Sequence, residues 1–177
     1  MTAADRPSRG EPLALDLVNT HWRADDGERD LLDGRAGARA WLAEHALGHD
    51  ARPAERAALI AARAAIRATL EREPAGRTAL NAVLARGRVL HELGAGGPRE
   101  RVEVPAEQAA AWAAARDLLR LLADRPERLH RCANPECVLW FEDTTRPGTR
   151  RWCSMAACGN RAKGLRHGAR ARARGAR

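Results

Sequence analysis

Apolar residues recur at helical spacing along most of the first 125 residues of the chain. Pro suits the first position of a helix, so one helix is predicted from Pro53 to about Glu73. The same spacing predicts shorter helices over residues 36–47 and 78–87, and a long Ala-rich helix after Pro105. For residues 13–22 the pattern fits a short strand as well as a short buried helix.

The pattern changes between residues 89 and 104. Val89, His91 and Leu93 recur at every second position, a glycine-rich stretch follows, and Val102 and Val104 again stand two positions apart. This predicts a β-hairpin with a loop longer than the favoured two residues, and His91 half-buried on its apolar face. Residues 23–35 are polar with turn signals. We therefore expect a mainly α fold with one small β-hairpin in the N-terminal region.

All four cysteines lie in the C-terminal quarter, as two close pairs: Cys132, Cys137, Cys153 and Cys158. Four thiolates in this arrangement predict one structural, tetrahedral Zn²⁺ site, with no open position for a catalytic water. The spacer between the pairs predicts a second hairpin, in which Val138–Phe141 pairs with Arg150–Trp152 across a turn at residues 146–148. The second pair runs into a predicted helix, so the module is expected to be a treble-clef-like zinc finger.

So small a module has little apolar surface, and the metal must supply most of its folding free energy. Chelation is accordingly expected to unfold residues 131–170 and to leave the helical region folded.

The net charge of +8 is confined to this same region. Residues 131–177 contain eleven bases and three acids, whereas residues 1–130 contain twenty of each. A basic stripe on the predicted last helix, with flanking arginines, favours binding to DNA. The candidate nucleic-acid-binding residues are Arg150, Arg151, Asn160, Arg161, Lys163, Arg166 and Arg170.

The stretches Arg131–Cys137, Phe141–Asp143, Arg150–Met155 and Cys158–Lys163 together closely resemble the bacterial CGNR zinc finger. The region before them resembles the ABATE domain that commonly precedes this finger, through Leu15–Thr20 and the helix–hairpin–helix order. The resemblance implies a stress-linked bacterial transcription regulator whose finger binds DNA. The expected domains are a helical domain over 12–126, a finger over 128–170 and a basic tail over 171–177.

Several polar residues stand beside the first apolar segment: Asp16, Asn19, Thr20 and His21. They allow two interpretations. The four side chains could line a pocket for a small-molecule effector, or they could cap elements and form buried hydrogen bonds, as these residue types often do. The helical domain is expected to sense such a ligand, to form a homodimer, or both.

Other function classes are disfavoured by what the sequence lacks. It has no apolar run of the ~18–20 residues that a membrane span needs, and no secretory signal is recognisable, so a cytoplasmic, nucleoid-associated protein is expected. No catalytic set stands out, so an enzyme is not expected. RNA binding and docking to an acidic protein remain alternatives to DNA binding.

Overall fold

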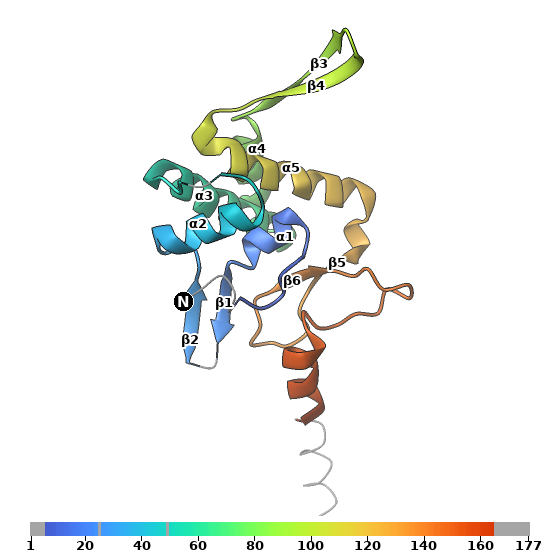
Figure 1. Ribbon diagram of the computed structural model, residues 1–177. Helices are drawn as coiled ribbons and strands as arrows, with labels where there is room; N and C mark the ends of the chain where they lie inside the picture. Colours follow the sequence, from blue (N-terminus) through green and yellow to red (C-terminus); the bar gives the residue numbers. More distant parts are fainter. Residues whose placement is uncertain (1–5, 25, 49, 165–177) are drawn as a thin grey trace, which may run out of the picture.

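The computed structural model describes residues 6–24, 26–48 and 50–164 of the chain (Figure 1). The helices are α1 (Leu13–Val18), α2 (Arg35–Glu44), α3 (Pro53–Leu70), α4 (Gly76–Leu84) and α5 (Ala109–Asp124). Short 3-10 turns precede and follow α5, η2 (Ala106–Gln108) and η3 (Pro126–Arg128), and η4 (Met155–Gly159) is a π-helical turn that continues helically to residue 164. The strands form three antiparallel hairpins: β1 (His21–Ala24) with β2 (Gly27–Asp30), β3 (Arg88–Gly94) with β4 (Gly97–Glu103), and β5 (Leu129–Arg131) with β6 (Trp140–Glu142).

Helices α1, α3 and α5 pack together to form the centre of the core, and α4 covers α3 and α5. The largest fully buried side chains there include Trp41, Leu59, Ile66 and Leu118. Alanines at 62, 65, 114 and 115 are also buried, which lets the helices approach closely. The helices predicted from periodicity are confirmed, and Pro53 is the first residue of α3 as expected.

The ambiguous segment at residues 13–22 contains both kinds of element. Leu13–Val18 is helix α1, and the chain then enters strand β1 at His21. Apart from His21 and Trp22, the β1–β2 hairpin lies in the polar stretch for which no element was predicted. Its strands have mixed polar composition and only Trp22 is buried, so they carry no alternating apolar signal.

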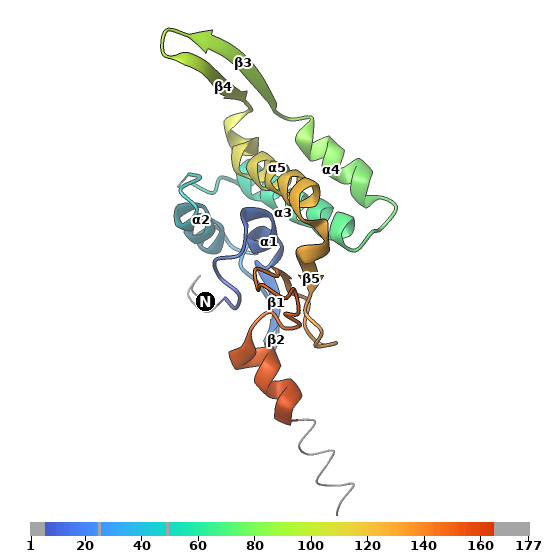
Figure 2. The ribbon, with the colours of Figure 1, turned by 90° about the vertical axis from the view of Figure 1, so that its right-hand side faces the viewer.

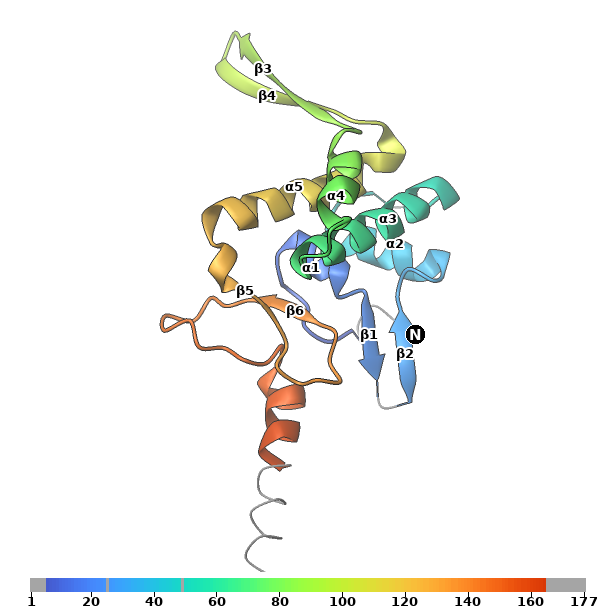
Figure 3. The same cartoon turned by 180° about the vertical axis from the view of Figure 1, so that it is seen from behind.

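The predicted β3–β4 hairpin is present, with two corrections. Gly94 pairs with Gly97, so the loop has two residues and is shorter than predicted. His91 is not half-buried, because 81% of its side chain is exposed. The hairpin projects from the helical body into solvent, as Figures 1–3 show from three sides, so its apolar-looking face does not reach the core.

The second predicted hairpin has a different partner strand. Residues 150–152 form no strand, and β6 pairs instead with β5, which lies before the first cysteine. The first cysteine pair therefore lies in the loop of its own hairpin. The overall fold class is nevertheless as expected: mainly helical, with small two-stranded sheets and a C-terminal cysteine-rich finger.

The finger and the β3–β4 hairpin lie at opposite ends of the molecule, with the helices between them (Figures 1 and 3). Among the residues that the structure describes, no helix is long and apolar enough to span a membrane.

Candidate metal centre

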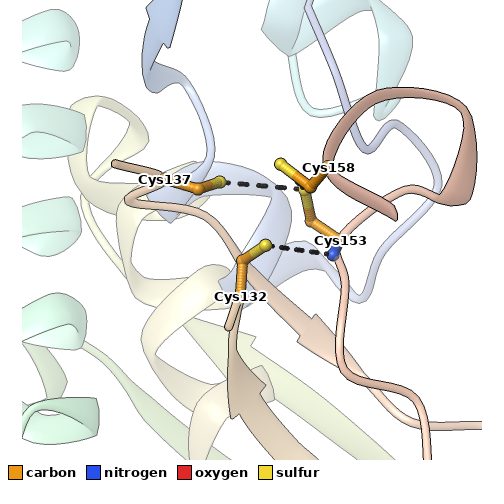
Figure 4. A group of neighbouring side chains, drawn as sticks. All are labelled: Cys132, Cys137, Cys153 and Cys158. Atoms are coloured by element: carbon orange, nitrogen blue, oxygen red, sulfur yellow. Dashed lines mark hydrogen bonds between the residues drawn. The ribbon is translucent and has the colours of Figure 1, made fainter. Parts of the chain in front are cut away.

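The four cysteine sulfurs converge on one point between the β5–β6 loop and η4 (Figure 4). All four Sγ atoms lie within 4.8 Å of one another. The Sγ of Cys153 is 3.8 Å from that of Cys137 and 3.7 Å from that of Cys158. A tetrahedron with metal–sulfur bonds of about 2.3 Å has sulfur–sulfur edges of about 3.8 Å, so the cluster fits one Zn²⁺ held by Cys132, Cys137, Cys153 and Cys158.

Backbone and amide donors surround the sulfurs. Cys132 N–H donates to the Leu139 carbonyl and Cys137 N–H to the Asn134 carbonyl, which closes the first cysteine turn. The Cys153 N–H points at the Cys132 sulfur, and Asn134 Nδ2 donates to the Cys158 sulfur, each at 3.5 Å. Such donors orient and stabilise thiolate ligands. Asn134 was not among the predicted site residues, because its contact with Cys158, 24 positions away in the chain, is made only in the folded finger.

Close contact among the thiols of Cys132, Cys137 and Cys153 moves their pKa values apart. Hydrogen bonds from Cys137 and Cys153 lower the pKa of Cys132 to about 2. The same contact with Cys132 raises the pKa of Cys137 to about 12, and the pKa of Cys153 is raised as well. Several thiolates at this spacing repel one another, so they require a cation between them. Zn²⁺ supplies that positive charge in a four-cysteine site.

The finger is fastened to the helical domain through a buried amide. Asn19, just after α1, donates from Nδ2 to the Trp140 carbonyl at 2.8 Å and accepts from the Trp140 N–H at 3.0 Å. Arg67 of α3 donates to the carbonyls of Val18 and Val138, and so joins the two regions a second time. Leu139, Trp140 and Phe141 belong to the same hydrophobic core as the helices. The finger therefore shares its core with the helical domain.

The segment before α1 also reaches the finger. Glu11 accepts hydrogen bonds from the Glu142 N–H and from Arg150, and Ser8 donates to the Cys153 carbonyl. Burial raises the pKa of Glu11, and the bonds from Glu142 N–H and Arg150 oppose that rise. The sequence showed no sign of these long-range contacts.

Arg150 occupies the interior of this junction. Its guanidinium donates to Glu11 and to the carbonyls of Glu142, Trp152 and Cys153, and it lies 4.2 Å from the centre of the Phe141 ring. Asp143 accepts from the Arg150 N–H and from Thr145, and the Thr145 hydrogen bond lowers its pKa. Arg150 thus joins the finger to the segment before α1. Its guanidinium donors are largely engaged in hydrogen bonds within the chain.

The other predicted nucleic-acid-binding residues divide into two groups. Arg151, Asn160, Arg161 and Lys163 are exposed around the end of the finger. Arg151 lies over the half-buried Trp152 ring, 5.4 Å from its centre, and Asn160 donates to the Ala156 carbonyl. Arg166 and Arg170 lie outside the described residues.

The four polar residues considered for a ligand pocket face different neighbours. Asp16 is buried and accepts from Arg6, Trp41 and His45, while Asn19 binds Trp140. Thr20 is buried, donating to the Leu17 carbonyl and accepting from Arg63. His21 lies 3.6 Å from Glu28 across the β1–β2 hairpin. These contacts give each side chain an intramolecular role and do not bring the four together around one cavity.

The fold and the cysteine cluster define a zinc-finger protein with an N-terminal helical domain. Residues 11–125 match the ABATE family, described as "Putative stress-induced transcription regulator", and residues 128–172 match the CGNR zinc finger. The chain belongs to the ABATE family and ends in a CGNR finger. Neither description is that of an enzyme. No curated protein matches the chain.

Proposed function

We propose that the chain is a zinc-dependent, DNA-binding regulator of transcription whose finger contacts the duplex. The observation that carries this proposal is the confinement of the whole net charge of +8 to residues 131–177, beside the four-cysteine cluster. DNA is a dense polyanion, and clustered Lys and Arg supply the larger part of affinity for it. The family's description as a regulator of transcription supports the same role.

The few acids of the finger do not offset this charge at its surface. Glu142 and Asp143 are buried, and Glu142 pairs with Arg125 at 3.4 Å. The Asp143 carboxylate accepts hydrogen bonds from the backbone N–H groups of Thr145 and Arg150. Glu136 is then the one exposed acid among the described residues 131–164. The outward face of the finger is therefore strongly positive.

Within this surface, Arg151, Arg161 and Lys163 are proposed to bind phosphates. Asn160 is proposed to reach a base edge, since the Asn amide can pair with adenine through two hydrogen bonds. Arg166 and Arg170 extend the same basic stripe in the sequence. Arg150 holds the finger on the helical domain instead, because its guanidinium donors already bind Glu11 and three carbonyls.

The helical domain is proposed to position the finger and to assemble the protein, in a non-enzymatic, cytoplasmic regulator. Residues 1–130 carry no net charge, which suits contacts with protein better than contacts with DNA. A small-molecule effector has weaker support, because the side chains of Asp16, Asn19 and Thr20 already form hydrogen bonds within the protein.

The test measures binding of the full-length, zinc-loaded protein to a labelled random-sequence duplex at several salt concentrations. If four to six phosphates are engaged, log K falls with log salt at a slope of about −4 to −5. The double variant Arg151→Ala/Lys163→Ala should reduce the size of that slope by about 2. The double variant Arg77→Ala/Arg86→Ala removes the same charge from exposed positions in and just after α4, and should bind like the unmodified chain.

A slope near zero, or equal losses in both double variants, would contradict the proposal. Competing RNA and duplex DNA for the same protein separates the two nucleic acids. Stronger competition by RNA, or salt-sensitive binding to an acidic protein without binding to either nucleic acid, would replace DNA as the partner.

A further inference from the structure

The projecting β3–β4 hairpin has an apolar face that its own chain leaves exposed. The antiparallel register places the pairs Val89–Val102, His91–Glu100 and Leu93–Pro98 on one face, since alternate pairs share a side of a hairpin. Leu93, beside the loop, is 85% exposed, and Val102 is 46% exposed. An isolated two-stranded ribbon is only marginally stable in water, so a partner that covers this face would stabilise it.

The opposite face of the hairpin is mostly charged, and Leu90, opposite Arg101, is its one apolar side chain. Arg88 pairs with Glu103, Arg99 pairs with Glu92, and Arg101 bridges both glutamates. Positive and negative side chains are therefore interspersed on this face. The hairpin is thus amphipathic, with a polar outer face and an apolar face that turns toward α5, as the Arg116–Glu100 ion pair at 3.2 Å shows.

An apolar groove lies where the hairpin meets α5. It has a volume of about 760 Å³, and its lining includes the apolar residues Val102, Val104, Trp112 and Leu119 together with charged side chains of α5. Leu119 is 44% exposed, whereas Leu118 and Leu121 of the same helix are buried and Leu122 is partly buried. Val102 belongs both to this groove and to the apolar face of the hairpin, so the two surfaces are continuous.

The charges around these surfaces indicate what covers them. The hairpin carries three arginines and three glutamates, and α5 carries two arginines and two aspartates. Both surfaces are neutral with signs interspersed, which suits neither a polyanion nor a strongly charged protein. The Arg-rich segment beyond residue 164 is also a poor occupant, since it is basic and the helical segment that leads into it, residues 155–164, lies at the other end of the molecule (red in Figures 1 and 2).

A second copy of the chain meets these requirements. We propose that the protein forms a two-fold dimer in which the hairpin tip of each subunit, Leu93 with Pro98, fills the groove of the other. Strands of seven residues reach about 24 Å, long enough to cross a neighbouring helix. A two-fold exchange uses both unfilled apolar surfaces twice, and because the charges of the hairpin and α5 are already paired within each subunit, the two copies meet without net repulsion.

The experiment measures the mass of the full-length, zinc-loaded protein by sedimentation across a range of concentrations, without DNA. Leu93→Asp removes the apolar tip, and Leu119→Lys places a charge in the groove. Each should raise the dimer dissociation constant about 100-fold, because each change is felt at two equivalent contacts. Both residues are exposed in the single subunit, so helical content should stay unchanged. Met155→Asp, at a third exposed apolar position, on the finger, is the control and should remain dimeric.

Mixing the two variants tests the exchange itself. A mixed dimer restores one contact between an intact tip and an intact groove, so the mixture should dimerise more tightly than either variant alone. A monomeric unmodified protein, or variants that stay dimeric, would overturn the proposal. Dimers lost in both variants without recovery on mixing would also overturn the exchange. Because DNA is absent from every arm, a failure here is distinct from failure of the proposed DNA binding.

Discussion

At the scale of single residues, buried polar side chains specify how the parts of this molecule meet. Asn19 satisfies both backbone groups of Trp140, and each would otherwise be buried without a partner. The sequence placed Asp16, Asn19 and Thr20 beside an apolar segment and left open whether they form a pocket or buried hydrogen bonds. Residue types alone could not decide this, because the hydrogen-bond partners are distant in the sequence. Arg6 and Trp41 lie 10 and 25 positions from Asp16, and Trp140 lies 121 positions from Asn19.

Asp16 gives the stability of the protein a dependence on acid. Burial opposes its ionisation, but hydrogen bonds from His45 and Arg6 outweigh burial and lower its pKa. A lowered folded-state pKa contributes stability that is present above the unfolded value of about 3.9 and is lost as pH falls through the lower folded value. Asp16→Asn should cost about 3 kcal/mol at neutral pH, since it removes the buried charge partner of Arg6 and leaves only the more exposed Glu44, at 3.3 Å, to balance that guanidinium.

The measurement is chemical denaturation of both proteins between neutral pH and pH 2. The gap between the unmodified chain and Asp16→Asn should narrow below about pH 4. Asp33→Asn, at an exposed position, serves as the control and should follow the unmodified chain throughout. A gap that stays constant down to pH 2 would show that the charge of Asp16 does not stabilise the fold.

At the scale of elements, the sequence predicted those whose pattern is local and missed those fixed by tertiary contacts. Helices α3 and α5 and the β3–β4 hairpin carry periodic apolar residues and were predicted. The strands β5 and β6 have three residues each, too few for a period to show, and the spacer suggested the wrong partner at residues 150–152. The cysteine ligands were predictable from spacing, whereas Asn134 and Arg150 act through contacts made only in the folded finger.

The crossing of α3 and α4 depends on the absence of one side chain. A Cβ at Gly76, the first residue of α4, would lie 2.6 Å from the Ala68 carbonyl carbon and 2.6 Å from the Thr69 nitrogen. Backbone cannot move aside cheaply, so Gly76→Ala should destabilise the fold by roughly 1–3 kcal/mol. Gly96→Ala meets nothing within 4 Å and should change stability by less than about 0.5 kcal/mol. Denaturant midpoints measure both, and equal midpoints would show that α4 does not need this close approach.

At the scale of the whole molecule, the finger and the helices form one packed unit with a shared core. Phe141 is fully buried, Cys132 and Cys153 are nearly so, and all three belong to the same cluster as Leu15 and Leu118. The sequence predicted a finger that unfolds alone after chelation. Because its core is shared, and because Asn19 and Arg67 bind its backbone, loss of the finger would leave buried groups of the helical domain without partners.

Removal of the metal should therefore lower the thermal stability of the helices themselves. A ligand that binds only the folded state stabilises the entire cooperative unit, and structural Zn²⁺ contributes several kcal/mol. In a chain of this size about 1 kcal/mol corresponds to 2–4 °C, so chelation should lower the melting temperature of the helices by about 10 °C or more.

Far-UV circular dichroism follows the melting of the helices while metal content is measured in the same samples. Cys153→Ser should melt at the lower temperature with or without chelator, and restoring Zn²⁺ should rescue only the unmodified chain. If the helices melted at the same temperature after the zinc had gone, the finger would be an independent domain and its contacts with Asn19 and Arg67 would carry no coupling.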